Sequence, residues 1–208
     1  MIPRRIVVFG SSTVYGTADT EKGGFVNRLR LWHESVDARN RVYNLGIWGE
    51  GTESLIERIA GEARARRPHL ILVYPGFNDC RRVGSREAPN ASTIGEFGEL
   101  MRRLIGEAKG VADTVVMTGY PFDESRTCPY PGSEVFYCLS DARAYTERLV
   151  AVTTENGVGV LDFFGAFGRE NMTGLLAEDG LHGNAECHKR LFERTRDFLR
   201  ERYGEANS

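Results

Sequence analysis

Ser12, Asp179 and His182 are the residues of this sequence whose types and spacing could perform nucleophilic catalysis. A serine hydroxyl is a weak nucleophile, so it needs a nearby base such as histidine. The histidine in turn needs a partner on its other ring nitrogen, which sets the tautomer and stabilises the imidazolium. Asp179 and His182 are three positions apart, so a single local turn brings them together. The set is typical of acyl transfer through a covalent intermediate.

Fixed hydrogen-bond donors are the second requirement of that chemistry, because a negatively charged oxygen develops on the carbonyl group. Gly49 lies in a glycine-rich segment where a backbone N–H can face a ligand without a side chain in the way. The side-chain amide of Asn78 and the backbone N–H of Ser12 are the other candidate donors. Asp79 is an alternative carboxylate, but it directly follows Asn78, and we expect it to brace its loop.

Short apolar runs alternate along the chain with longer stretches of helical periodicity. The runs predict strands at residues 5–9, 42–45, 70–73, 114–118 and 158–161. The periodic stretches predict helices at 25–36, 52–66 (with Thr52 as its N-cap), 92–109, 140–156 and 185–203. This alternation predicts an α/β fold with a parallel sheet covered on both faces. The candidate residues follow strands or precede the last helix, so we expect them at the carboxyl edge of the sheet, where ligands bind.

Four segments carry the candidate residues, at positions 9–16, 44–52, 76–79 and 179–182. Their order and spacing resemble the sequence blocks of the SGNH hydrolases, also called GDSL lipases and esterases. The resemblance spans most of the chain. It implies a flavodoxin-like, three-layer α/β/α sandwich with a central parallel sheet of about five strands, in a single hydrolase domain over residues 1–208.

The resemblance also implies a role for each candidate residue. Ser12 would be the nucleophile, His182 the general base and then the general acid, and Asp179 the residue that orients His182. Ser12 N–H, Gly49 N–H and the Asn78 amide would hold the oxyanion. No cofactor and no metal ion are expected, because no His, Cys and carboxylate cluster has metal-site spacing.

One position departs from the family pattern. The first block usually reads Gly-Asp-Ser, and Ser11 stands here in place of the aspartate. The change creates an ambiguity between two serines as nucleophile, which the register with Thr13 and Gly16 resolves in favour of Ser12. It also puts in question how the loop that holds the nucleophile is braced.

These observations predict a serine esterase that hydrolyses a carboxylic ester with a short acyl group, such as acetyl, on a small molecule or a sugar. An acyl thioesterase and a lysophospholipase-like lipase are alternatives that use the same residues. A binding protein that has lost catalysis is the non-enzymatic alternative, for which Ser11 is the only hint. The intact Ser12, Asp179 and His182 argue against it.

Composition excludes several other classes. The 208 residues are 41% hydrophobic and 27% charged, as in soluble globular proteins. A net charge of −2 gives no basic field that would attract nucleic acid. No apolar run is long enough to span a bilayer, and no export signal is visible, so we expect a cytoplasmic protein. The glycine pattern at 10–16 matches neither a dinucleotide fingerprint nor a phosphate loop. The sequence does not indicate an oligomeric state.

The four cysteines form no CxxC pair, and we expect reduced thiols. A Cys128–Cys138 disulfide is the alternative, because both residues fall in one loop region. That region, residues 119–138, contains three prolines and lacks helical periodicity. Loops of this length are usually functional, so we expect a lid or a pocket wall there.

The remaining conspicuous side chains have open assignments. We expect structural roles for the three other histidines, namely His33, His69 and His188. The aromatic residues at strand ends either line a pocket or pack the core; these are Trp48, Phe77, Tyr120 and Phe122. The arginines that follow Asp79 could meet an acidic substrate, although a solvated loop is the expected reading; these are Arg81, Arg82 and Arg86.

Overall fold

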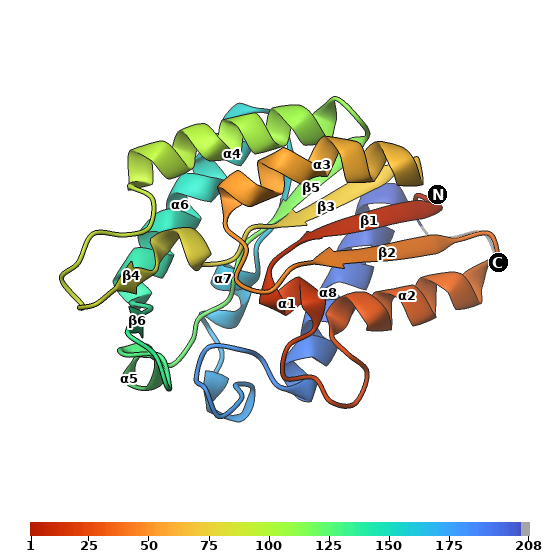
Figure 1. Ribbon diagram of the computed structural model, residues 1–208. Helices are drawn as coiled ribbons and strands as arrows, with labels where there is room; N and C mark the ends of the chain where they lie inside the picture. The colour runs from red at the N-terminus through yellow and green to blue at the C-terminus, as the bar shows by residue number, and fades with distance from the viewer. Residues whose placement is uncertain (205–208) are drawn as a thin grey trace.

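A parallel sheet of five strands forms the centre of the structure, a computed structural model that describes residues 1–204 (Figure 1). The strands lie in the order β2-β1-β3-β5-β7. Their bounds are β1 (Arg5–Gly10), β2 (Arg41–Gly46), β3 (Leu70–Tyr74), β5 (Asp113–Met117) and β7 (Gly159–Leu161). All four neighbouring pairs are parallel. The predicted parallel sheet is therefore confirmed, with strand ends shifted by at most one residue.

The central strand β3 and its neighbour β1 are apolar because both of their faces are covered. Every residue of β3 is buried, and so is every residue of β1 except its first. Successive side chains of a strand point to opposite faces, and β1 follows this rule. Ile6 and Val8 contribute to one hydrophobic core, whereas Val7 and Phe9 contribute to the other.

Helices cover both faces of the sheet, as Figure 1 shows. One layer contains α2 (Phe25–Val36), α7 (Phe163–Phe167) and α8 (Ala185–Tyr203). The other contains α3 (Thr52–Arg66), α4 (Ile94–Lys109) and α6 (Leu139–Glu155). The fold is therefore the expected three-layer α/β/α sandwich.

The predicted N-cap of α3 and the predicted start of α4 are wrong. Thr52 is the first residue of α3, and Gly51 is its N-cap. The Asp79 carboxylate supplies the cap from outside the helix, since it accepts hydrogen bonds from Thr52 N at 3.1 Å and Thr52 Oγ1 at 2.8 Å. Helix α4 begins at Ile94 and not at residue 92, because Thr93 and Glu96 form a capping box there.

The segment 119–138 contains more regular structure than its sequence pattern indicated. It includes the short helix α5 (Glu124–Thr127) and strand β6 (Val135–Phe136). Strand β6 pairs antiparallel with β4 (Arg82–Val83), and neither strand was predicted from the sequence. Both strands have only two residues, too few for an apolar–polar alternation to be recognised.

The carboxyl edge of the sheet has a change of strand order between β1 and β3. The chain leaves β1 for β2 on one side and then crosses to β3 on the other side. Such a crossing opens a crevice beyond the strand ends. Ser12, in the four-residue helix α1 (Ser12–Tyr15), and Asn78, in the 3-10 helix Asn78–Cys80, both lie at this point.

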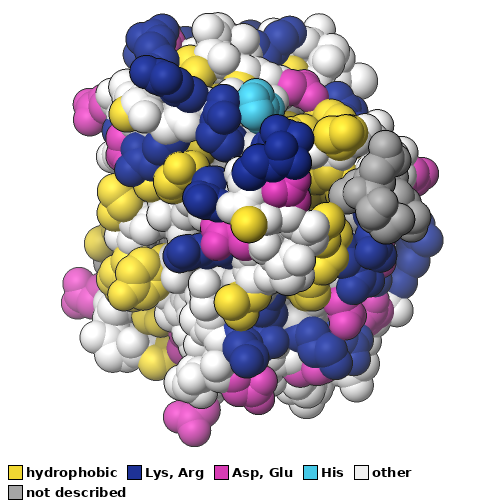
Figure 2. Space-filling view, turned by 90° about the vertical axis from the view of Figure 1, so that its right-hand side faces the viewer, with side chains coloured by type: hydrophobic (Ala, Val, Ile, Leu, Met, Phe, Trp, Pro, Cys, Tyr) yellow, Lys and Arg dark blue, Asp and Glu magenta, His cyan; other side chains and the backbone are white. Residues whose placement is uncertain are grey.

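The opposite end of the molecule, where the strands begin, presents Lys and Arg side chains with Asp and Glu among them (Figure 2). Ser12, Gly49 and Asn78 follow the carboxyl ends of β1, β2 and β3, at the other end of the sheet. Asp179 and His182 are hydrogen-bonded to Ser12 in one chain, so all five candidate site residues lie away from this face. Among residues 1–204, no helix has the length and apolar character needed to cross a membrane.

Candidate active site

Ser12 is placed by a tight passage from strand β1 into helix α1. Gly10 ends the strand, and a Cβ atom there would lie 2.3 Å from the carbonyl oxygen of Tyr74. Gly46, at the end of β2, packs equally closely, since its Cβ would lie 2.2 Å from the backbone nitrogen of Tyr15. Only glycine permits these two approaches, and together they hold the short helix against the ends of the sheet.

Ser12, His182 and Asp179 form a continuous hydrogen-bonded chain across 170 residues of sequence. His182 Nε2 lies 2.8 Å from Ser12 Oγ, and His182 Nδ1 lies 2.5 Å from Asp179 Oδ2. The other carboxylate oxygen of Asp179 accepts from the backbone N–H groups of Leu181 and His182, each at 2.9 Å. The turn between Asp179 and His182 is thus closed by its own aspartate.

The protonation of this chain follows from the state of Asp179. Burial raises the pKa of Asp179, but the side-chain and backbone hydrogen bonds from His182 outweigh burial and lower it to about 2. The carboxylate is therefore ionised and can only accept a hydrogen bond. His182 Nδ1 must carry the proton, which leaves Nε2 free to accept the proton of the Ser12 hydroxyl.

Three candidate hydrogen-bond donors, on Ser12, Gly49 and Asn78, line one pocket beside His182. Asn78 Nδ2 donates to Glu50 O at 2.9 Å, and Asn78 Oδ1 accepts from Tyr137 Oη at 3.1 Å. These two bonds fix the amide and leave one N–H of its two unused. The N–H groups of Ser12 and Gly49 have no acceptor among residues 1–204. All three residues line the larger of two hollows beside His182.

The two hollows differ in size and in lining, and Ser12, Asn78 and His182 border both. The smaller is a recess of about 30 Å³ whose further lining includes Ser11, Thr13, Gly76, Phe77 and Tyr120. The larger is a pocket of about 170 Å³ whose further lining includes Trp48, Gly49, Arg81, Tyr130, Ser133 and Val135. Ser12 therefore lies between a small cavity and a larger one.

Two tyrosines of the site were missed in the sequence. Tyr130 Oη donates to Asp179 Oδ2 at 3.1 Å, and Tyr137 Oη donates to Asn78 Oδ1 at 3.1 Å. Both come from the segment 119–138, for which the sequence predicted a lid or a pocket wall. Proline content marked the segment, but no local pattern distinguishes these two tyrosines from the others in the chain.

The structure resolves most of the open assignments. Asp79 braces its loop as expected: it is buried, burial raises its pKa, and its oxygens accept from Thr52. Trp48, Phe77 and Tyr120 line the two hollows, whereas Phe122 packs in a separate apolar cluster.

The other histidines have structural contacts. His188 links Phe25 N and Thr17 O, and His33 contacts the backbone oxygens of Pro3 and Arg4. His69 contacts the Arg5 side chain. Ser11, which stands where the family has aspartate, is only 3% exposed, and a Cβ at Gly76 would lie 2.8 Å from its hydroxyl oxygen.

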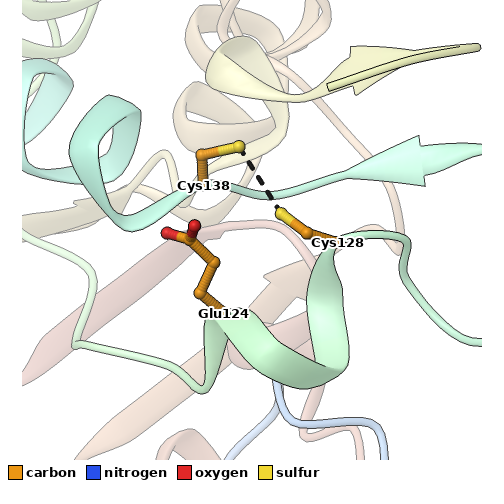
Figure 3. Close-up of side chains that lie close together, drawn as sticks. All are labelled: Glu124, Cys128 and Cys138. Carbon is orange, nitrogen blue, oxygen red and sulfur yellow. Dashed lines mark hydrogen bonds between the residues drawn. The ribbon is translucent and has the colours of Figure 1, made fainter. Parts of the chain in front are cut away.

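One cluster could hold a metal ion among the residues that the structure describes: Glu124, Cys128 and Cys138 (Figure 3). All four cysteines are free thiols, and the Cys128 and Cys138 sulfur atoms lie 3.5 Å apart. Glu124 is already engaged, since one carboxylate oxygen pairs with Arg86 and the other accepts from Leu139 N. Burial and the neighbouring Cys138 raise the pKa of Cys128 to about 12. A metal ion would have to displace both the arginine and the thiol protons.

Comparison with known proteins gives a family match. The model of the GDSL-like Lipase/Acylhydrolase family matches residues 8–190. A comparison with curated protein sequences finds no match.

Solved structures with the same architecture accompany the family match. A lipase/acylhydrolase from Enterococcus faecalis superposes with a TM-score of 0.76 at 20% identity, covering 98% of this chain and 100% of that one. An acetylxylan esterase from Geobacillus stearothermophilus has a TM-score of 0.70 at 17% identity, covering 94% of each chain. The psychrotrophic esterase EstA from Pseudoalteromonas has a TM-score of 0.68 at 16% identity, covering 95% of this chain and 97% of that one. At these identities the likeness concerns the fold.

Proposed function

Because the chain belongs to the GDSL-like lipase/acylhydrolase family and is an ester-hydrolysing enzyme, we propose that it cleaves short-acyl carboxylic esters with Ser12 as nucleophile. The observation that carries the proposal is the hydrogen-bonded chain from Ser12 Oγ through His182 to Asp179, at 2.8 and 2.5 Å. One hydrolase domain over residues 1–208 performs the reaction.

The acylation step begins when Ser12 Oγ attacks the ester carbonyl carbon and His182 Nε2 takes the hydroxyl proton. The imidazolium that forms is stabilised by Asp179, whose lowered pKa keeps it ionised. Ser12 N–H, Gly49 N–H and the unused N–H of Asn78 donate to the oxyanion. When the intermediate collapses, the bond to the alcohol oxygen breaks, and His182 donates its proton to that oxygen.

Deacylation repeats the same transfers with water. His182 takes a proton from a water molecule as the water oxygen attacks the acyl carbon. The second tetrahedral intermediate uses the same three donors. Its collapse releases the carboxylic acid and returns the proton from His182 to Ser12 Oγ.

The small volume of the recess supports the proposal that the acyl group of the substrate is short. A volume of about 30 Å³ holds one or two groups of about the size of water, and a methyl group is of that size. The larger pocket of about 170 Å³ then receives the alcohol portion. The acetylxylan esterase from Geobacillus stearothermophilus has the same fold, which agrees with an acetyl ester as substrate.

The test combines active-site labelling with a chain-length series. A fluorophosphonate probe should label wild-type protein at Ser12, and mapping of the labelled peptide should identify that residue. Ser12→Ala should remove both the label and the hydrolysis of p-nitrophenyl acetate. Ser11→Ala is the matched control, because the neighbouring serine is buried and should leave the label in place. Labelling of Ser11 in the wild type, or full activity of Ser12→Ala, would overturn the assignment.

The preference for a short acyl group is tested by comparing kcat/KM for esters of different chain length. We expect kcat/KM for p-nitrophenyl acetate to exceed that for p-nitrophenyl octanoate, because eight carbons do not fit the recess. The reverse order would favour a lipase. Faster turnover of acetyl-CoA than of the acetate ester would favour a thioesterase.

A further inference from the structure

Three arginines follow the loop of Asn78, and the structure separates them by their partners. Arg82 forms a two-pronged ion pair with Asp141, at 2.7 and 2.8 Å. Arg86 pairs with Glu124. The Arg81 side chain makes no ion pair with any carboxylate among residues 1–204. Its guanidinium makes one long hydrogen bond, 3.5 Å from Nη1 to Gly49 O, and lies beside the Tyr137 hydroxyl, a neutral group.

Arg81 is also the one of the three that lines the larger pocket beside Ser12. No acidic side chain of the described residues lines this pocket. Asp79 lies close enough for the Arg81 charge to act on its pKa, but its oxygens accept from Thr52 and Ser92. The pocket therefore contains a partly buried guanidinium group whose charge the protein leaves unpaired.

An unpaired, partly buried guanidinium group is suited to bind an anionic ligand. Its planar N–H groups fit the oxygen atoms of a carboxylate or a phosphate in pairs. In a partly buried pocket such a contact is less screened by water than on the open surface.

We propose that Arg81 forms an anion subsite and that the enzyme prefers short-acyl esters whose alcohol portion carries a carboxylate or a phosphate group. The inference rests on the function proposed above. It assigns the anion to the alcohol portion because Arg81 lines only the larger pocket, whereas the recess beneath Ser12 has room for a small acyl group.

A different role for Arg81 makes a distinct prediction. Its Nη1 atom lies near the backbone of Gly49, whose N–H we assign to the oxyanion. If the guanidinium acted on the oxyanion itself, its loss would slow every ester by the same factor. A subsite for the alcohol portion instead changes the preference between esters.

The experiment compares esters that differ in charge at one place. The probes are 4-acetoxybenzoate, its uncharged methyl ester, and 4-acetoxyphenyl phosphate. We expect Arg81→Gln to lower the ratio of kcat/KM for the charged over the uncharged ester by about tenfold or more, the size of a hydrogen bond to a charged group. The change should reside mainly in KM. The carboxylate and phosphate arms show which anion fits better.

Two further variants complete the design. Arg81→Lys keeps the charge but loses the paired geometry, so it should restore part of the preference. Arg86→Gln is the control. It removes an equal charge from an arginine that pairs with Glu124 and does not line the larger pocket, so the ratio should stay unchanged.

Equal losses on all three esters in Arg81→Gln, or an unchanged ratio, would overturn the anion subsite. Those results would leave the esterase assignment intact, because the wild type would still hydrolyse the uncharged ester. If the wild type hydrolyses none of the three and the Ser12 label is absent, the proposed function itself fails.

Discussion

The hydroxyl group of Tyr130 donates a hydrogen bond to Asp179 Oδ2 at 3.1 Å, the same oxygen that lies 2.5 Å from His182 Nδ1. Burial, together with the negative charge of Asp179, raises the pKa of Tyr130 to about 12. Tyr130 therefore remains a donor at any pH at which the enzyme would be assayed. In the proposed mechanism Tyr130 is a positioning residue, which acts through Asp179.

Replacement of this donor should slow the reaction without weakening substrate binding. We expect Tyr130→Phe to lower kcat several-fold, up to about tenfold, because one hydrogen bond to a charged group is lost. KM for p-nitrophenyl acetate should change little. Steady-state kinetics check this, with Tyr43→Phe as control, since the Tyr43 hydroxyl has no hydrogen bond among residues 1–204. An unchanged kcat would show that Asp179 is held by the His182 and Leu181 N–H groups alone.

Loss of the Asn78 amide should lower kcat more than loss of the Tyr137 hydroxyl group that holds it. We expect Asn78→Ala to lower kcat by about 10²–10³-fold, the usual effect of removing one oxyanion donor. Tyr137→Phe keeps the amide but removes the bond to its Oδ1, so a smaller loss is expected. A kcat for Asn78→Ala within about threefold of wild type, far less than the usual loss for one oxyanion donor, would remove Asn78 from the oxyanion site.

The close packing of Gly46 against helix α1 predicts a coupled loss of stability and activity. In Gly46→Ala the new methyl group would lie 2.2 Å from the backbone nitrogen of Tyr15, so the helix that begins with Ser12 must shift. We expect a lower Tm and a lower kcat.

A second glycine provides the control for that experiment. Gly106 lies inside helix α4, and a Cβ there meets nothing within 4 Å. Gly106→Ala should raise stability by about 0.5–1 kcal/mol, because alanine favours the helix. Thermal unfolding and ester hydrolysis, measured on both variants, separate the two cases. Equal Tm values for Gly46→Ala and wild type would contradict the tight approach.

The lowered pKa of Asp179 predicts a dependence of stability on acid. The group has a pKa of about 2 in the folded protein against an ordinary value of 3.8, so its ionised form favours folding. Its contribution is complete above about pH 4–5 and is lost as the pH falls toward 2. We expect the difference in unfolding free energy between wild type and Asp179→Asn to be constant above pH 5 and to shrink below it.

Urea unfolding at a series of pH values measures that difference. A difference that stays constant down to pH 2 would show that Asp179 has no favourable ionised state in the folded protein.

The amino-acid sequence was enough to predict the order of the five sheet strands and the five long helices, and the family. Helices α2, α3 and α8 begin and end where the apolar periodicity predicted, since an amphipathic stripe is a property of neighbouring residues. The order of the four motif segments selected Ser12, Asp179 and His182, which the structure brings within hydrogen-bond distance of one another. Their catalytic roles stay a proposal.

The side chains that support these residues are visible only in the folded chain. Tyr130 contacts Asp179 across 49 positions, Tyr137 contacts Asn78 across 59, and Asp79 caps helix α3 from 27 positions away. The ion pairs of Arg82 and Arg86 also join distant segments. They distinguish these two arginines from Arg81, which has no carboxylate partner in the pocket. Local periodicity contains no information about such pairs, because packing of the whole chain decides which side chains meet.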